Sequence, residues 1–470
     1  VNLVQRTNER NSAGSVQDLK YMKCIVFEDF LLDMEEAILT SSKSAKALFA
    51  FTREDQRRVT WKRFQEVLWP RMKVERQKRS SKLQITLEPL VVYTQIRTHI
   101  KGSLEAVCAM KPIELEDYLE FATKRCRLTK EQRIETYELY RIYAAFLEEE
   151  GRWDDNDRAL DIIEAAKWDD GTRINWNRFG GGMGGAWDRV YVDEIQDNTQ
   201  AEIALFMLVG GLRGNNLMLA GDMAQSVVEG IEFRFEEVRT LLHTFSAGGS
   251  MDKSELLARS SIGREMSARK PSLLKVNYRS HAGVLDVASK VLEVLFSHFP
   301  GAAKTLPKDK GLLRGPRPLF YHVSQDTALS ILASNQSYVT LVVDADREAE
   351  LTRMQPDEND KSTVLTIRDA KGLEFPNVII YNFFSHLLGA NREQHKSWVG
   401  MLSRSTDAHA VDPQFQYQHP ELEGHIKLLY TAITRCCSQL VFVEVKSNAN
   451  NAGERFFRFL VEGELGHKQT

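Results

Sequence analysis

The chain has 470 residues, more than one ordinary hydrophobic core accommodates, so we expect two or three domains. Hydrophobic residues make up 43% and charged residues 27%, which is typical of globular proteins. No apolar run approaches the roughly 20 residues that a membrane-spanning helix requires, so we expect no membrane partner. The formal net charge of -3 gives no general sign of a polyanionic partner.

Cysteine usage and the first residues bear on the compartment. Five cysteines without C-x-x-C spacing argue against a disulfide framework and against a zinc finger. The opening stretch, VNLVQRTNERNSAG, has no initiator methionine and no legible targeting signal, and it reads as the trimmed end of something longer. We expect an intracellular protein, nuclear or cytoplasmic, with an organelle left open.

The positive charge is concentrated in residues 53–82, which we call the basic segment. It holds eleven lysines and arginines against four acids. Three aromatic residues interleave with these cations, an arrangement that suits base stacking beside phosphate-binding side chains. The alternative is a solvated helical face with its aromatic residues in the core. The aromatic residues are Trp61, Phe64 and Trp69, and the candidate contacts for nucleic acid are Arg57, Arg58, Lys62 and Arg63.

Residues 27–166 have a helical pattern. The clearest helix follows Thr129, which with Gln132 forms a capping box, and apolar residues then recur at three- to four-residue steps until Gly151. Five glycines within residues 180–185 interrupt any regular element and predict a flexible crossing.

The remainder of the chain alternates between predicted strands and helices, which favours parallel α/β sheets. We predict a hinge near residues 246–255 and a surface connection over residues 300–318. The predicted strands are Val190–Val192, Leu217–Ala220, Leu273–Val276, Val364–Ile367, Val378–Tyr381 and Leu440–Val445.

Ligands of such sheets bind where strands end, and the first strand ends in VDEIQD. Asp193 directly after a strand is well placed to hold Mg²⁺ through water, and Glu194 to orient or deprotonate an attacking water. This is the Walker B arrangement of phosphoryl transfer. Taken alone, the same acids could cap the following helix.

Three further groups of polar residues follow later strands, and a fourth group lies on a last helix. The second strand ends in LMLAGDMAQS with Gln225, and the third in LKVNYRSH with Tyr278 and Arg279. The fourth leads into TIRDAKGLEF, which contains Gly372 and Glu374, and a last helix carries LLYTAITRC. Each group taken alone can be explained as a turn or a helix cap, but five groups in this order rarely coincide by chance.

This series resembles motifs II to VI of superfamily 1 helicases of the UvrD/Rep/PcrA kind, over roughly residues 188–445. The stretches VYTQIRTHIKGSLEA and YLEFATKRCRLT further resemble the UvrD-like helicase region of large eukaryotic proteins. The resemblance implies an ATP-dependent helicase or translocase on single-stranded DNA or RNA, with ATP and Mg²⁺ as cofactors.

The resemblance also implies roles for individual residues. Asp193 would hold Mg²⁺ and Glu194 would activate water, while Gln225 would sense the γ-phosphate. Arg279 and Arg435 would act as arginine fingers, and Tyr278 would stack on adenine. Glu374 would contact the ribose end of the nucleotide, next to Gly372, and Thr366 is a further candidate for nucleic-acid contact.

The implied fold is α/β, with two RecA-like parallel-sheet domains and an all-helical insertion. Residues 1–26 would be the remnant of the first RecA-like domain, which is incomplete at its N-terminus, and residues 27–170 the insertion. Residues 171–250 would complete the first domain, and residues 251–470 would form the second. ATP would be hydrolysed between the two domains.

The sequence departs from the family pattern in one large respect. It contains no G-x-x-x-x-G-K-[ST] loop to cradle phosphates, and GGGMGG has neither the lysine nor the hydroxyl. We expect an upstream segment or a separate chain to supply this loop, so that these residues alone bind ATP weakly. The alternative is a non-catalytic helicase-like scaffold subunit of a larger complex.

Overall fold

The computed structural model gives two compact units, each described by itself. The first unit comprises residues 1–222 and 228–271, and the second comprises residues 223–227 and 272–470. The described residues are 4–6, 23–41, 55–79, 85–122, 125–167, 189–209, 217–246, 271–299, 308–354, 362–389, 391–404, 415, 419–446 and 451–469.

The first unit contains a four-stranded sheet in the order β2-β1-β3-β4. Strand β1 pairs antiparallel with β2 and β3, whereas β3 and β4 are parallel. The strands are β1 (Val4–Arg6), β2 (Lys23–Ile25), β3 (Val190–Val192) and β4 (Leu217–Leu219). Strands β3 and β4 confirm two sequence predictions, but β1 and β2 were not predicted.

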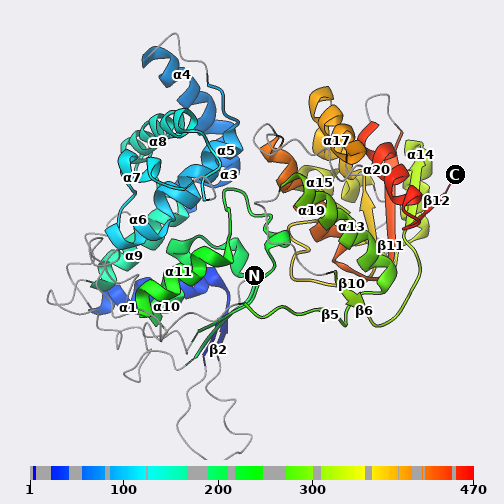
Figure 1. The fold of residues 1–470 in the computed structure, drawn as a ribbon, viewed down its shortest axis with the longest axis horizontal. Helices are drawn as coiled ribbons and strands as arrows, with labels where there is room; N and C mark the ends of the chain where they lie inside the picture. Colours follow the sequence, from blue (N-terminus) through cyan, green and yellow to red (C-terminus); the bar gives the residue numbers. More distant parts are fainter. Residues whose placement is uncertain are drawn as a thin grey trace, which may run out of the picture. The chain divides into compact units, whose positions relative to one another are not determined.

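Two helices pack together beside this sheet (Figure 1). Helix α10 (Gln200–Val209) is buried along its whole length, because it is apolar on nearly every face. Helix α1 (Phe27–Ser41) packs on it through Phe30 and Phe206, whose ring centroids are 5.2 Å apart. Helix α11 (Phe235–Ser246) follows later in the chain.

The described residues between 55 and 167 are mainly helical, as the periodicity predicts. The capping box is confirmed, since the Gln132 backbone N–H donates to Thr129 Oγ1 and the Thr129 N–H donates to Gln132 Oε1. Gly151 ends that helix with φ 61°. The helices are α3 (Trp61–Arg63), α4 (Trp69–Arg79), α5 (Pro89–Thr94), α6 (Leu104–Ala109), α7 (Leu115–Leu119), α8 (Lys130–Glu150) and α9 (Asp155–Lys167), with π-helical turns η3 (Phe64–Leu68) and η4 (Gln95–Lys101).

The second unit is built on a six-stranded sheet in which every pairing is parallel, in the order β12-β7-β11-β10-β8-β9. A separate parallel pair joins β5 (Val276–Asn277) to β6 (Lys310–Gly311). The six strands are β7 (Leu319–Val323), β8 (Val339–Val342), β9 (Val364–Thr366), β10 (Phe375–Tyr381), β11 (Cys436–Val445) and β12 (His467–Gln469).

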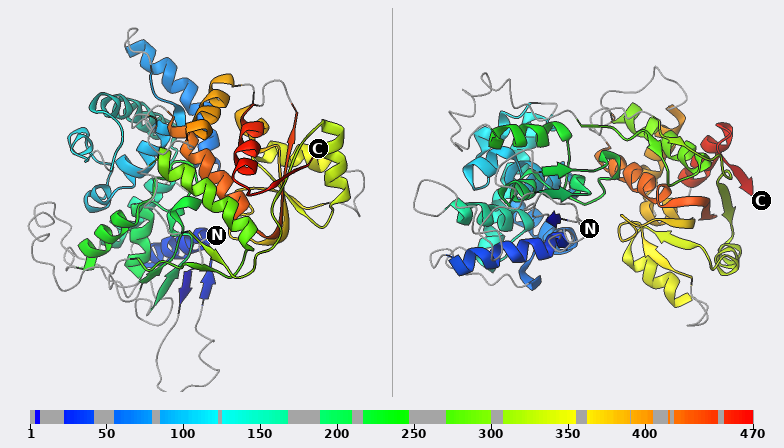
Figure 2. Two further views of the ribbon diagram at one scale, coloured as in Figure 1. Left: turned by 45° about the vertical axis from the view of Figure 1, so that its right-hand side comes forward. Right: turned by 90° about the horizontal axis from the view of Figure 1, so that it is seen from below.

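Helices cover both faces of this sheet, as Figures 1 and 2 show. Along β10, Val378 and Ile380 face one hydrophobic core, and Ile379 and Tyr381 face the other. A strand buried on both faces is continuously apolar, which explains this run. The first core includes α13 (Ala282–His298), α16 (Phe383–Leu388), α17 (Arg392–Arg404), α19 (Pro420–Ile433) and α20 (Asn451–Glu462), and the second includes α14 (Gln325–Ser334) and α15 (Ala345–Met354).

The prediction of an α/β protein with parallel sheets is therefore confirmed. Strands β6, β7, β8 and β12 were not predicted, and the third predicted strand is shifted, because β5 is Val276–Asn277. The glycine-rich crossing and all of the predicted hinge except Ser246 lie outside the described residues. The presence of two RecA-like domains and the four-part domain division stay predictions. Among the described residues, none of the helices is long and apolar enough to cross a membrane.

Candidate active site

Asp193 and Glu194 lie at the carboxyl end of β3, where β3 and β4 end side by side with Val192 opposite Leu219. Asp193 is exposed, and its Oδ1 accepts the Glu194 backbone N–H at 3.0 Å. Glu194 has φ 54° and ψ 39°, a left-handed conformation that a residue with a side chain adopts at a cost of about 1–2 kcal/mol. Strained residues of this kind gather at functional sites.

Gln196 ties this turn to the end of β4. It is fully buried, its Nε2 donates to Glu194 Oε2, and its Oε1 accepts the Asp222 backbone N–H at 3.0 Å. Gly221 makes room for it, because a Cβ at this position would lie 2.3 Å from Gln196 Oε1. The acidic turn after β3 and the glycine turn after β4 are therefore one hydrogen-bonded structure.

Gln225 and Arg435 meet within the second unit. One Arg435 nitrogen donates to Gln225 Oε1 at 2.7 Å, and Lys371 Nζ donates to the Gln225 carbonyl at 2.6 Å. Arg435 also donates to the carbonyls of Thr431 and Leu373. Its side chain is 1% exposed, so these bonds satisfy a buried cation.

Arg279 and Glu374 form an ion pair at 2.5 Å between Nε and Oε2, with both side chains partly exposed. Asn277 shapes the loop that carries Arg279, because its Oδ1 accepts the backbone N–H groups of Arg279 and Ser280. Ser280 then donates to the Cys436 carbonyl at 2.7 Å, which joins the loop to the start of β11. The loop also presents Tyr278, which is 80% exposed and therefore accessible for stacking.

The backbone conformation explains why residue 372 is glycine, and a local turn explains why residue 366 is threonine. Gly372 has φ 79°, and a Cβ placed on it would meet nothing within 4 Å, so backbone conformation alone favours glycine there. Thr366 is 6% exposed, and its hydroxyl donates to Asp369 Oδ2 at 2.5 Å while accepting the Asp369 N–H. This threonine holds the turn after β9, and its hydroxyl already has partners for both roles.

The aromatic residues of the basic segment lie largely in the core, as the alternative interpretation of this segment predicted. Phe64 and Trp69 are buried, and Phe64 packs on Tyr93 with ring centroids 4.8 Å apart. Trp61 is half-buried against the same two rings. The reason is helical periodicity, since residues 64, 68, 69 and 72 share the inner face of one helix.

The four candidate cations of this segment differ in their surroundings. Arg58 donates to Asp155 at 2.7 Å; burial opposes its charge, but Asp155 and Glu28 offset this and raise the pKa of Arg58. Arg63 donates to the Gln56 carbonyl, Arg57 is half-buried and Lys62 is exposed. Lys73, Lys78 and Arg79 on α4 are also exposed. The solvent-facing charge is therefore centred on α4, further along the segment than the sequence suggested.

A magnesium ion fits the donors at the end of β3 only in part. Carboxylates suit Mg²⁺, which commonly takes one or two of them together with waters and substrate phosphates. No group of three or more metal-ligating side chains occurs among the described residues. Asp193 would therefore hold the ion with waters and phosphate oxygens, and the ion would neutralise charge on those phosphates.

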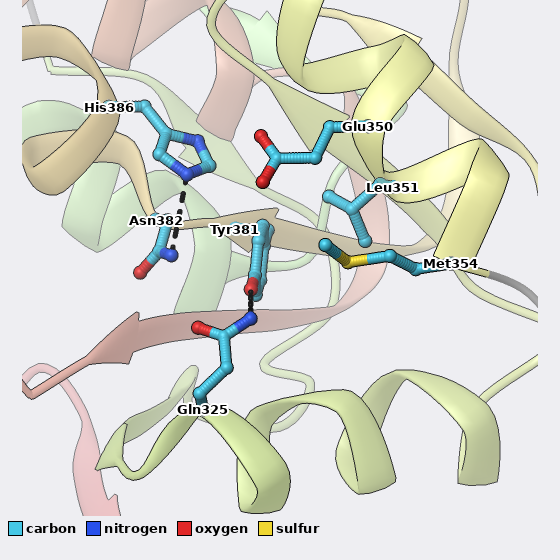
Figure 3. Close-up of a pocket in the computed structure, with 7 residues that line it drawn as sticks. All are labelled: Gln325, Glu350, Leu351, Met354, Tyr381, Asn382 and His386. Atoms are coloured by element: carbon cyan, nitrogen blue, oxygen red, sulfur yellow. Dashed lines mark hydrogen bonds between the residues drawn. The ribbon is translucent and has the colours of Figure 1, made fainter.

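A small pocket lies in the second unit beside Tyr381, the last residue of β10 (Figure 3). Its volume of about 60 Å³ holds a few water molecules and excludes a nucleotide. Gln325 donates to the Tyr381 hydroxyl, and Asn382 lies near His386. Burial and the charge of Arg347 lower the pKa of His386 to about 4, so this imidazole is neutral at pH 7.

Sequence reasoning gave Gln196 and Arg97 no role. Arg97 donates to Asp155, Glu202 and the Glu229 carbonyl, and thereby links η4 to α10 and to the loop after Gln225. The signal for Arg97 was present in VYTQIRTHIKGSLEA, which stood out only as a resemblance. Gln196 stood within VDEIQD, but its second partner lies 26 residues further on.

The comparisons with known proteins find a family match over part of the chain. Residues 330–447 match the model of the UvrD-like helicase C-terminal domain, and this match confirms the resemblance drawn from the motifs. One relative is human TPR and ankyrin repeat-containing protein 1, which is 31% identical over 91% of this chain. The chain spans 15% of that relative's length.

A solved structure gives a weaker likeness. The C-terminal domain of a possible DNA helicase from Lactobacillus plantarum WCFS1 is 16% identical to this chain, with a TM-score of 0.24. The match covers 41% of this chain and 99% of that domain.

Proposed function

We propose that these residues form part of an ATP-dependent translocase or helicase that acts on single-stranded nucleic acid. The observation that carries the proposal is the contact of Arg435 with Gln225, beside Lys371. These residues come from three separated motifs, and phosphoryl transfer needs cations and a sensing amide in one place. Arg279 adds a fourth motif, and its ion-pair partner Glu374 lies in the same motif as Lys371.

In this proposal, two RecA-like domains hold ATP between them. Glu194 accepts a proton from water as the water oxygen forms a bond to the γ-phosphorus. The bond from that phosphorus to the β–γ bridging oxygen breaks, and ADP leaves with the electron pair. Asp193 would hold Mg²⁺, which would neutralise charge on the phosphates, while Arg279 and Arg435 stabilise the charge that spreads over the phosphoryl oxygens.

The other site residues bind the nucleotide and the strand. Tyr278 stacks on the adenine through its exposed ring, and Glu374 contacts the ribose beside the Gly372 turn. Single-stranded DNA or RNA contacts exposed cations of the basic segment, with Lys62 the best exposed of the original candidates. Domain closure and opening during hydrolysis would move the strand.

The phosphate-binding loop has to come from outside these 470 residues, because no G-x-x-x-x-G-K-[ST] sequence occurs within them. We propose that an upstream segment of the natural protein, or a separate chain, supplies it. The relative is long enough to accommodate such a segment, since the aligned region is 15% of it.

A second candidate is a non-catalytic scaffold subunit of a larger complex, with or without nucleic acid. The burial of Arg435 favours it, because the residue is 1% exposed and its guanidinium already donates to Thr431, Leu373 and Gln225. An arginine finger would have to exchange the Gln225 contact for a phosphate oxygen. In a scaffold, the same contact would be permanent.

We also propose an intracellular setting, nuclear or cytoplasmic. All five cysteines lie in the described parts of the chain and are free thiols, which agrees with a reducing compartment.

A translocation assay separates the two candidates. The longest natural chain that contains these residues is mixed with single-stranded DNA or RNA carrying biotin and streptavidin at one end, and streptavidin release is followed with and without ATP. ATP-dependent release from one end only supports the translocase. Streptavidin release that is the same with and without ATP, on both DNA and RNA, supports the scaffold.

A further inference from the structure

The turn after β3 contains a buried amide that the family roles leave without a function. Gln196 is 0% exposed, and burying an amide without hydrogen bonds costs about 1–3 kcal/mol. Both ends of the amide are bonded, the oxygen to the Asp222 N–H and the nitrogen to Glu194 Oε2. The Asp222 N–H can only donate, so it fixes which end of the amide faces Glu194.

A glutamate carboxylate needs such a partner to hold one orientation. The terminal torsion of glutamate is broad, and rotation about it would move the oxygen that accepts a proton. Three backbone bonds hold the main chain of the turn: Ile195 N to Ala220 O, Ala220 N to Val192 O, and Asp197 N to Glu194 O. The Gln196 Nε2 bond adds a constraint on the carboxylate itself.

The same amide connects the base to the motif that contains Gln225. Asp222 follows Gly221, whose lack of a side chain leaves space for the Gln196 oxygen at a distance where a Cβ would clash. Gln225 lies three residues after Asp222 in the chain. A displacement of the glycine turn would therefore pull on Gln196 and turn the Glu194 carboxylate.

We propose that Gln196 is a positioning residue, which orients the Glu194 carboxylate toward the attacking water and links it to the turn at Gly221 and Asp222. This proposal rests on the proposed ATP hydrolysis. Its specific content is that the N–H donor of Gln196 matters for turnover, beyond any part that the side chain plays in stability.

Two substitutions separate the donor from the acceptor. Gln196→Glu keeps the size and an oxygen near the Asp222 N–H, but it replaces the donor with a second carboxylate beside Glu194. Gln196→Met has similar length and loses both bonds. Gln200→Met is the matched control, because Gln200 is 7% exposed and donates to Glu237 Oε2 at 2.9 Å, away from Glu194.

The experiment measures kcat and KM for ATP in the longest natural chain, with saturating single-stranded nucleic acid, and circular dichroism verifies that each variant is folded. We expect both Gln196 variants to lower kcat about 10- to 100-fold, since misorientation of a reacting group costs rates of this order. We expect KM to change less than about twofold, because the lost contact acts on the transition state. The Gln200→Met chain should match the wild type.

The ordering of the variants decides the result. Gln196→Glu should be at least as slow as Gln196→Met, although it is the more conservative change. A Gln196→Glu chain with wild-type kcat would overturn the positioning role, even if Gln196→Met were inactive or unfolded. An equal loss in Gln200→Met, or a change confined to KM, would overturn it as well. If the wild type itself shows no turnover, the proposed function fails and this inference fails with it.

Discussion

Replacing Arg97 with methionine tests whether buried ion pairs hold the helical region to the helix that follows the acidic turn. Arg97 donates to Glu202 Oε1 at 3.3 Å and to Asp155 Oδ2 at 3.1 Å. Burial opposes the charge of Arg97, but Glu202 and Asp155 more than offset this and raise its pKa. Methionine keeps much of the volume and removes the cation.

Asp155 and Glu202 both lose an ion pair in this variant, but only Asp155 keeps a second cation. Asp155 keeps Arg58, whose Nε lies 2.7 Å from Asp155 Oδ1. Glu202 is 3% exposed and keeps the Thr199 N–H and hydroxyl, which are uncharged donors. The buried Glu202 carboxylate is then left without its cation, which lowers the free energy of unfolding by about 3–5 kcal/mol. Because Thr199 still donates to it, we expect the lower end, about 3 kcal/mol.

Urea unfolding of the chain at pH 7.5, followed by tryptophan fluorescence, measures this loss. The probe reports mainly on the first unit, since six of the seven tryptophans precede residue 222. Burial raises the pKa of Glu202 already, so the loss should shrink at pH 5.5, where the unpaired acid takes up a proton more readily. Adding Glu202→Gln should recover at least half of it.

The control is Arg79→Met on α4. Arg79 is 56% exposed and lies 3.5 Å from Glu75, so its loss should cost less than about 0.5 kcal/mol. If Arg97→Met costs no more than this control, or if Glu202→Gln restores nothing, the buried pairs do not hold the two elements together.

Three further predictions concern pH, the glycine turn and strand binding. The free energy of unfolding of the second unit should fall by about 2 kcal/mol between pH 7 and pH 5, because the pKa of His386 is about 4 in the folded state and near 6.5 in the unfolded state. Calorimetry should show a smaller fall for His386→Gln. The same pH dependence in both proteins would contradict this prediction. Gly221→Ala should lower the free energy of unfolding in urea by about 1–3 kcal/mol, because the new Cβ would lie 2.3 Å from Gln196 Oε1. An unchanged free energy of unfolding would show that the turn adapts freely. Lys73→Glu with Lys78→Glu should weaken binding of a labelled single-stranded oligonucleotide and flatten its salt dependence in fluorescence anisotropy, whereas unchanged binding would return the basic segment to a solvated face.

The sequence predicted the strands that are apolar and followed by turn residues. Strand β3 matches its prediction, and β10 and β11 extend theirs by a few residues. Strand β12 reads His-Lys-Gln and lies at the edge of the sheet, where no apolar face is required, so it has no hydrophobic signature. Strand β7 was not predicted, because its sequence LFYHV mixes aromatic and polar residues.

The candidate site was predictable where one short stretch carries the chemistry. Asp193 and Glu194 lie at the end of a strand as expected, and Arg435 meets Gln225 although 210 positions separate them. The roles of Gln196 and Arg97 were not predictable, since Gln196 bonds to Asp222, 26 positions further on, and Arg97 bonds to Glu202, 105 positions away. For the basic segment the sequence left two interpretations open, and the structure has Phe64 and Trp69 in the core, as the helical alternative predicted.

We propose that the acidic turn after β3 belongs to an ATP-hydrolysing site. The most direct test is the rate of ATP hydrolysis by the longest natural chain that contains these residues, with and without single-stranded nucleic acid, compared with Glu194→Gln. We expect turnover that the nucleic-acid strand stimulates and that Glu194→Gln reduces at least about 100-fold, because the substitution removes the general base. A natural chain that carries a phosphate-binding loop and shows no turnover, or one whose turnover survives Glu194→Gln, would contradict it.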